Sequence, residues 1–143
     1  MFDRLVENLG RASVAGDAAQ IRNPETQLAA AMLLYAVLPA DNVIRPEESF
    51  ELRLTLQRLL RVGDVQAQHL ISRAVSAYSR EPSLLACATI LKHRFTLGFR
   101  NSLFEAARRI AAADGQIHVN EADVLSRITS LLGLNAMPQR LSA

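Results

Sequence analysis

The chain of 143 residues is long enough for one domain, and half of its residues are apolar while only 5% are aromatic. Alanine and leucine supply most of the apolar side chains, which favours closely packed helices and disfavours a sheet. The formal charge of +2, without a dense basic stripe interleaved with aromatics, argues against nucleic-acid binding, and the single cysteine, Cys87, excludes an intrachain disulfide.

The first part of the chain predicts a short amphipathic helix followed by a buried one. The helix over residues 2–9 would bury Phe2, Leu5, Val6 and Leu9 on one side. Residues 10–22 contain two glycines and several small residues, so we expect a loop or a frayed extension of that helix. Asn23 and Pro24 are typical of a helix start. Apolar residues then lie on all sides up to Pro39, which predicts the central helix of the fold.

The middle and end of the chain predict five more helices. One follows Glu48 and ends at Gly63, and Asp64 is expected to cap the next, whose inner face would comprise Val65, Leu70, Ile71, Ala74 and Tyr78. Another begins at Glu81, and a break at residues 96–98 separates it from a helix that leads to Asp114. The last is expected to run from an Asn120 cap to Gly133. One face of each of these two helices is apolar and expected to be buried, namely Leu103, Ala106, Ala107, Ile110 and Ala111 in the first and Val124, Leu125, Ile128, Leu131 and Leu132 in the second. The sequence therefore predicts an all-α fold of about seven helices.

Two parts of the chain share a pattern that predicts an internal duplication. In both, an Asp closes one helix, an Ile follows three positions later, and a Glu follows seven positions after the Asp. The paired acids are Asp41 with Glu48, and Asp114 with Glu121. Apolar residues of the flanking helices also correspond, and we expect both loop isoleucines, Ile44 and Ile117, to be buried. We interpret the pattern as two pseudo-repeated helix-loop-helix units.

These residues also carry a family resemblance. The stretch I-A-A-A-D-G-Q-I-H-V-N-E over residues 110–121, followed by an amphipathic helix ending in L-L-G-L, resembles the second half of a TerB-like domain. TerB-like domains are small all-helical domains of bacterial tellurite-resistance proteins and of some membrane-anchored J-domain co-chaperones. The resemblance implies one helical domain over residues 24–134. Residues 1–23 would join this domain as a helix and loop, and residues 135–143 would form a loosely held tail.

The four acids support two readings. If a pseudo-twofold brings the loops together, Asp41, Glu48, Asp114 and Glu121 would offer the carboxylate oxygens that Ca²⁺ or Mg²⁺ prefers. The resemblance also implies a metal-related cluster at these four positions. Alternatively, each acid only fastens its own loop, because a carboxylate near a helix N-terminus can accept backbone hydrogen bonds. The spacing differs from that of an EF-hand, and His118 is a weak further candidate ligand.

Other residue patterns predict no catalysis. Ser, Cys and His form no recognisable nucleophile arrangement, and no Gly-rich phosphate loop occurs, so we expect no enzyme. Cys87 lies in an apolar helical stretch and is expected to be a small buried side chain. The arginines are expected to form a solvated face, pairing with acids such as Glu51 and Glu105.

Two functions follow from these observations. The first is a non-enzymatic TerB-like stress-response module that can hold a divalent cation at the paired acids. The second is a structural interaction domain without a ligand, which binds a partner helix in an apolar groove. In both cases we expect protein partners, among which a membrane-associated one is an alternative, no nucleic acid and a cytoplasmic location. No apolar run is long enough to span the ~30 Å core of a membrane.

Overall fold

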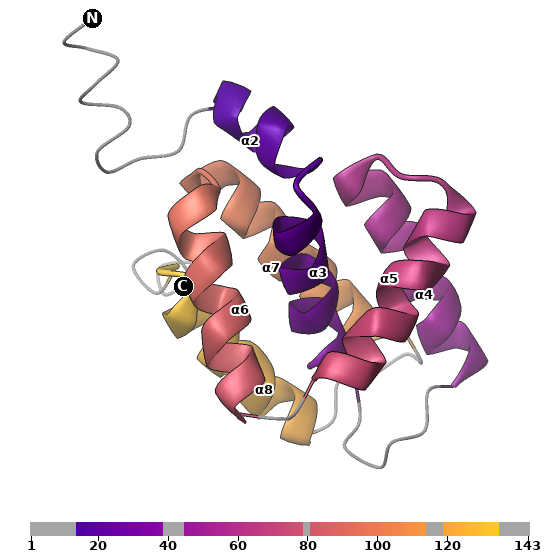
Figure 1. Ribbon diagram of the computed structural model, residues 1–143. Helices are drawn as coiled ribbons and strands as arrows, with labels where there is room; N and C mark the ends of the chain where they lie inside the picture. Colours follow the sequence, from indigo (N-terminus) through magenta and orange to yellow (C-terminus); the bar gives the residue numbers. More distant parts are fainter. Residues whose placement is uncertain (1–13, 39–44, 79–80, 114–118, 135–143) are drawn as a thin grey trace, which may run out of the picture.

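The computed structural model describes residues 14–38, 45–78, 81–113 and 119–134, and within these ranges the protein is entirely helical (Figure 1). The helices are α2 (Val14–Gln20), α3 (Pro24–Tyr35), α4 (Pro46–Leu60), α5 (Asp64–Ala77), α6 (Glu81–Arg94), α7 (Leu97–Ala111) and α8 (Val119–Leu131). The predicted all-α class is confirmed. The predicted helix over residues 2–9, Pro39, Ile44, Ile117 and the tail lie outside the described residues.

The central helix is α3, as the sequence predicts. It packs against α4, α5, α6 and α7 and occupies the middle of the molecule in Figure 1. The side chain of Asn23 caps it by accepting hydrogen bonds from the backbone N–H groups of Glu25 (2.9 Å) and Thr26 (3.1 Å). Its buried apolar residues are Ala29, Ala30, Ala31, Leu33 and Leu34. Three consecutive alanines let neighbouring helices approach on several sides.

Residues 10–22, where the sequence predicts a loop or a frayed helix, contain the short helix α2. Its anchor is Asp17, whose carboxylate accepts hydrogen bonds from the backbone N–H (2.9 Å) and the hydroxyl (2.6 Å) of Thr96. Ile21 directly after the helix is buried, and its carbonyl accepts a hydrogen bond from the Gln27 side chain at 2.8 Å. Contacts with distant residues therefore stabilise a helix that the local composition, with Gly16 inside it, does not favour.

The link between α4 and α5 differs from the prediction. Arg61, rather than Gly63, takes the left-handed conformation that ends α4 (φ 57°, ψ 46°). Gly63 is extended and occupies the N-cap position of α5, so Asp64 is the first residue of this helix and not its cap. The Asp64 carboxylate lies 2.8 Å from Arg53 Nε and accepts a hydrogen bond from Gln68 at 2.9 Å. These partners hold the carboxylate away from the position of a cap.

The inner face of α5 is displaced from the predicted one. Leu70 and Ala74 are buried as predicted, and Ile71 and Tyr78 are partly buried against the core. Val65 is 68% exposed, so its predicted burial is wrong. The first buried position is Ala67, and two residues correspond to about 200° around a helix, which turns Val65 toward solvent.

The last two helices agree with their predicted apolar faces. The buried residues are Leu103, Ala106, Ala107, Ile110 and Ala111 on α7, and Leu125, Ile128 and Leu132 on α8 and at its end. The predicted Asn120 cap is wrong, because α8 begins at Val119 and so includes Asn120. The apolar stripe begins only at Val124, several residues after the start of α8. The pattern therefore locates the first residue of this helix only to within a residue or two.

Gly133 ends α8, as predicted, with φ at +74°. The Gly133 N–H donates to the Ser130 carbonyl at 3.1 Å, and the Leu134 N–H donates to the Thr129 carbonyl at 2.8 Å. This pair of hydrogen bonds defines a Schellman motif. The guanidinium of Arg100 adds a third contact by donating to the Leu132 carbonyl at 2.6 Å, which joins α7 to the end of α8.

Replacing Gly133 with alanine is expected to lower the free energy of unfolding by about 1–2 kcal/mol or more, because the left-handed conformation strains any residue with a Cβ. The added Cβ would also lie 3.1 Å from an Arg100 guanidinium nitrogen. Gly98→Ala is the control, since the Cβ added there in α7 meets nothing closer than 3.8 Å and alanine favours the helix. Urea denaturation of both variants should give opposite signs, and equal effects would contradict this account.

The proposed repeats agree in the burial of corresponding residues. Leu34, Val37 and Leu38 are buried, as are Ala107, Ile110 and Ala111 in the second unit. Leu52 and Leu125 are both buried, whereas Leu59 is partly buried where Leu132 is fully buried. In both units the two helices contact each other, α3 with α4 and α7 with α8. The superposition of the two units stays a prediction.

Candidate functional site

Of the four predicted cation ligands, the structure describes one side chain. Asp41 and Asp114 lie outside the described residues. Glu121 lies in the first turn of α8, but its side chain is not described. Glu48 lies in the first turn of α4. Whether the four carboxylates meet is therefore still a prediction, and so is the suggested role of His118.

The Glu48 carboxylate is buried at the start of α4, with 3% of the residue exposed. One oxygen accepts a hydrogen bond from the Arg45 backbone N–H at 2.9 Å, and the other lies 3.9 Å from the Arg45 guanidinium. The carboxylate also lies where the helix dipole favours a negative charge. These contacts are of the kind expected for an acid that fastens its own loop.

Elsewhere in the described ranges, no group of three or more His, Cys, Asp or Glu side chains is arranged to hold a metal ion. Charged side chains instead form pairs, as predicted for Arg58 with Glu51 (3.7 Å) and for Arg108 with Glu105 (2.6 Å). Arg94 of α6 pairs with Glu25 of α3 at 2.9 Å and donates a hydrogen bond to the Thr26 hydroxyl at 3.0 Å. This last pair joins the C-terminal end of α6 to the N-terminal end of α3.

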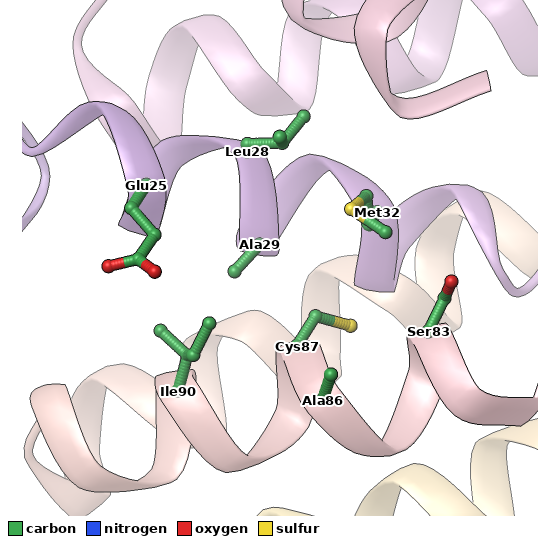
Figure 2. A pocket seen from close by; sticks show the side chains of 8 residues that line it. All are labelled: Glu25, Leu28, Ala29, Met32, Ser83, Ala86, Cys87 and Ile90. Atoms are coloured by element: carbon green, nitrogen blue, oxygen red, sulfur yellow. The ribbon is translucent and has the colours of Figure 1, made fainter. Parts of the chain in front are cut away.

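Beside this ion pair, α3 and α6 enclose an apolar groove of about 260 Å³ (Figure 2). We call it the α3–α6 groove, and it is lined by Glu25, Leu28, Ala29, Met32, Ser83, Ala86, Cys87 and Ile90. Figure 2 shows residues of α3 along one side of the groove and residues of α6 along the other. On each helix the lining residues follow the spacing i, i+3, i+4, i+7, so each helix contributes one continuous ridge.

The middle of the groove is open because the side chains that face each other there are small. Ala29 on α3 lies opposite α6, where Ala86 and Cys87 occupy the matching turn. Leu28 and Ile90 are only partly buried, and they form the walls. Met32 is also partly buried, and its flexible thioether can adapt to an incoming side chain.

Cys87 is a buried, free thiol on the groove side of α6, which confirms the prediction that it is a small buried side chain. It is 3% exposed, and its Sγ donates to the Leu84 carbonyl at 3.5 Å. Burial away from water raises the pKa of the thiol from 9.0 to about 12, although contacts with backbone groups of Cys87 and Ala88 oppose the shift. The thiol is therefore protonated at neutral pH and is a poor nucleophile.

The sequence does not predict this groove. A signal for it was present, since small residues recur at helical spacing on both helices, but the same pattern fits a closed helix-helix contact. The distance between two helices that are remote in the sequence decides between these cases.

Comparison with known families decides the identity of the fold. A family model described as "Tellurite resistance protein TerB" matches residues 27–140, which is most of the chain. The chain belongs to the TerB family. The resemblance seen in residues 110–121 is thereby confirmed. No curated protein and no solved structure gives a significant match.

The region that matches the TerB family model includes all helices from α3 to α8 except the first turn of α3. Both pairs of acids and both sides of the α3–α6 groove therefore lie in the TerB-matched region, apart from Glu25 at one end of the groove. Within the described ranges, no helix is both long and apolar enough to cross a membrane.

Proposed function

We propose that this TerB-family protein is a non-enzymatic adaptor in a stress response, and that its α3–α6 groove binds an amphipathic helix of a protein partner. The observation that supports this proposal is the groove itself, with its apolar lining and with one ridge from each helix along it (Figure 2). An amphipathic helix binds such a groove through apolar anchors at i, i+3 or i+4 and i+7. The ridges repeat at the same intervals.

The size and polarity of the groove agree with such a ligand. An apolar cavity of about 150 Å³ can accommodate benzene, so the larger groove of about 260 Å³ has room for more than one such group. The pair of Glu25 and Arg94 gives one end charged groups, while the remainder is apolar except for Ser83. A helix with an apolar face and one polar terminus would match this distribution.

Filling the groove is expected to weaken binding. Ala86 is exposed and lines the groove, so Ala86→Trp would occupy the space without disturbing the core. A suitable probe is a fluorescein-labelled helical peptide with leucines at i, i+3, i+4 and i+7 and alternating Glu and Lys elsewhere. Its Kd, measured by fluorescence anisotropy, should rise about tenfold or more for Ala86→Trp, since the indole would exclude an apolar anchor of the peptide and tenfold in Kd corresponds to only about 1.4 kcal/mol.

The matched control is Ala122→Trp, because Ala122 is an exposed alanine on α8 and does not line the groove. This variant should bind the probe as the parent does. Equal loss of binding in both variants, or none in either, would contradict the proposed site.

A second candidate function is the binding of a divalent cation by Asp41, Glu48, Asp114 and Glu121. It is favoured by the repeated spacing of the acids and by the matching burial of the residues around them. If a cation binds the folded protein, adding Ca²⁺, Mg²⁺, Mn²⁺ or Zn²⁺ must raise the Tm. An unchanged Tm with all four ions would reject the cation site and leave the groove as the functional feature.

The effect of Glu48→Gln separates the two readings of the acids. If Glu48 only fastens its loop, the variant should lose about 1–3 kcal/mol of unfolding free energy in metal-free buffer, because a buried charged acceptor becomes a weaker neutral one. If the carboxylates crowd around a cation site, removing one charge should leave the metal-free protein unchanged or more stable. We expect destabilisation, because of the contact with the Arg45 N–H.

The control for this substitution is Glu47→Gln, which changes an exposed acid in the same helical turn. Its effect should stay below about 1 kcal/mol, the usual size of an exposed contact with the helix dipole. Urea denaturation with EDTA, and again with added Ca²⁺, gives both comparisons. A more stable Glu48→Gln protein that no longer responds to Ca²⁺ would favour the cation site.

A further inference from the structure

We propose that the thioether of Met32 is an oxidation site that controls the α3–α6 groove, and that its conversion to the sulfoxide by a peroxide weakens the binding of a partner helix. This inference rests on the proposed function of the groove and adds a form of redox regulation to it. The groove binds its partner while Met32 is reduced and releases it when Met32 is oxidised.

Two sulfur-containing side chains line the groove, one from each helix. Met32 belongs to α3 and Cys87 to α6, and Figure 2 shows them on opposite sides of the groove. Met32 is only partly buried against the core, whereas Cys87 is 3% exposed. Of the three methionines in the chain, Met32 is the one that lies within the described residues. The groove therefore leaves the Met32 side chain partly open to solvent and covers Cys87.

The two sulfur atoms also differ in their reactivity toward hydrogen peroxide. A thiol reacts as the thiolate, and burial raises the pKa of Cys87 to about 12, so this sulfur stays protonated and reacts slowly. A thioether has no proton to lose, and its lone pair attacks a peroxide oxygen directly. One oxygen atom passes to the sulfur, the O–O bond breaks and water leaves, so the sulfur loses the two electrons that the peroxide gains. Met32 is therefore the sulfur of the groove that a peroxide oxidises.

The sulfoxide changes the groove at a position that a bound helix covers. Met32 lies one turn of α3 after Leu28 and Ala29, on the same ridge, so an apolar anchor of the partner contacts its side chain. The sulfoxide oxygen is polar, and on the open side of the free groove it stays hydrated. A bound helix removes that water and places apolar anchors against the oxygen, which is unfavourable. The penalty falls on the complex and not on the free protein, so oxidation lowers the affinity without unfolding the chain.

The first test measures binding before and after oxidation. The parent is treated with hydrogen peroxide, the peroxide is removed with catalase, and mass spectrometry gives the fraction of Met32 sulfoxide. The probe is the labelled leucine peptide described above, which contains no sulfur. Its Kd should rise about tenfold or more for the oxidised parent. Treatment with the two methionine sulfoxide reductases, one for each sulfoxide epimer, should restore the original Kd.

The matched control for oxidation is Met32→Leu, because leucine is close to methionine in volume and does not react with peroxide. This variant keeps Cys87, Met1 and Met137, so it reports any effect of oxidation at those sulfur atoms. It should bind the probe as the untreated parent does, with or without peroxide treatment. The far-UV circular dichroism and Tm of each protein establish that it is folded.

The second test introduces a polar group at the same position without an oxidant. Met32→Gln places an amide oxygen near the position of the sulfoxide oxygen on a side chain of similar length. The Kd of the probe should again rise about tenfold or more, because the amide loses its water when the helix binds. Met32→Leu should leave the Kd unchanged, which separates the effect of polarity from that of altered packing.

The outcomes of the two tests are distinct. Weaker binding by the oxidised parent and by Met32→Gln, with unchanged binding by Met32→Leu, supports the inference. If the parent binds the probe and Ala86→Trp weakens that binding, but full conversion to the Met32 sulfoxide leaves the Kd unchanged, the inference is wrong and the proposed function stands. The same conclusion follows if Met32 stays reduced at a peroxide dose that oxidises free methionine, or if peroxide weakens binding equally in Met32→Leu. If the untreated parent does not bind the probe, both the proposed function and the inference are wrong.

Discussion

Replacing Phe95 with alanine is expected to lower the free energy of unfolding by about 3–5 kcal/mol, the usual loss for truncating a buried phenylalanine. Phe95 follows α6 directly and is 1% exposed. Its ring stacks on that of Phe99 in α7 at a centroid distance of 4.0 Å. The cavity would thus open where α6 turns into α7, a place that cannot close without moving both helices. Urea denaturation measures the loss.

Phe50→Ala is the matched control for this effect. Phe50 lies on α4 and is 52% exposed, and its ring lies 5.7 Å from the Arg53 guanidinium carbon. Truncating this ring removes only the part of it that is buried and one exposed cation–π contact. The free energy of unfolding should therefore fall by only about 1 kcal/mol. Similar losses for the two phenylalanines would contradict the assignment of Phe95 to the core.

The sequence predicts a helix well where one face is apolar and the other charged. The apolar face of α7 is buried as predicted, because its arginines and Glu105 mark the opposite side clearly. The start of α3 also agrees, since Asn23 followed by Pro24 leaves few alternatives to a helix N-terminus. In these cases the local pattern and the tertiary packing favour the same structure.

The sequence predicts less well where distant contacts decide. The helix α2 depends on hydrogen bonds between Asp17 and Thr96, which no local pattern reveals. Asp64 resembles a helix cap, but the ion pair with Arg53 of the preceding helix engages its carboxylate. Val65 is apolar and close to the inner face, yet its position on α5 exposes it. Each of these predictions is wrong because it depends on a contact with another part of the chain, or on the direction in which a helix face points, and both are defined only in the folded protein.

The same distinction applies to the candidate sites. The repeated spacing of the acids predicts a site, and the one described side chain, Glu48, has the buried helix-terminal contact expected of a loop-fastening acid. The sequence does not predict the α3–α6 groove, because a hollow depends on the separation of two helices whose lining residues lie far apart in the sequence. Small residues at helical spacing permit a groove but do not require one.

The thiol of Cys87 is expected to react about a thousandfold more slowly with DTNB at pH 8 than an unperturbed thiol. Its pKa is raised from 9.0 to about 12. At a pH below the pKa, each unit by which the pKa rises lowers the fraction of reactive thiolate about tenfold. The control is Thr89→Cys in a Cys87→Ala background, which moves the thiol to an exposed position on the same helix. That variant should react at the ordinary rate, and a fast reaction of native Cys87 would contradict its burial.

The same shift predicts how stability depends on alkaline pH. Above pH 9 the unfolded chain loses the Cys87 proton, while the folded protein keeps it up to about pH 12. The unfolded state then binds fewer protons, so stability falls as the pH rises, by up to about 1.4 kcal/mol per unit within this window. Below pH 9 the contribution is fully present. Cys87→Ala lacks this dependence, so the stability difference between parent and variant should shift in favour of the variant from pH 9 upward. Parallel pH profiles would show that the folded thiol titrates normally.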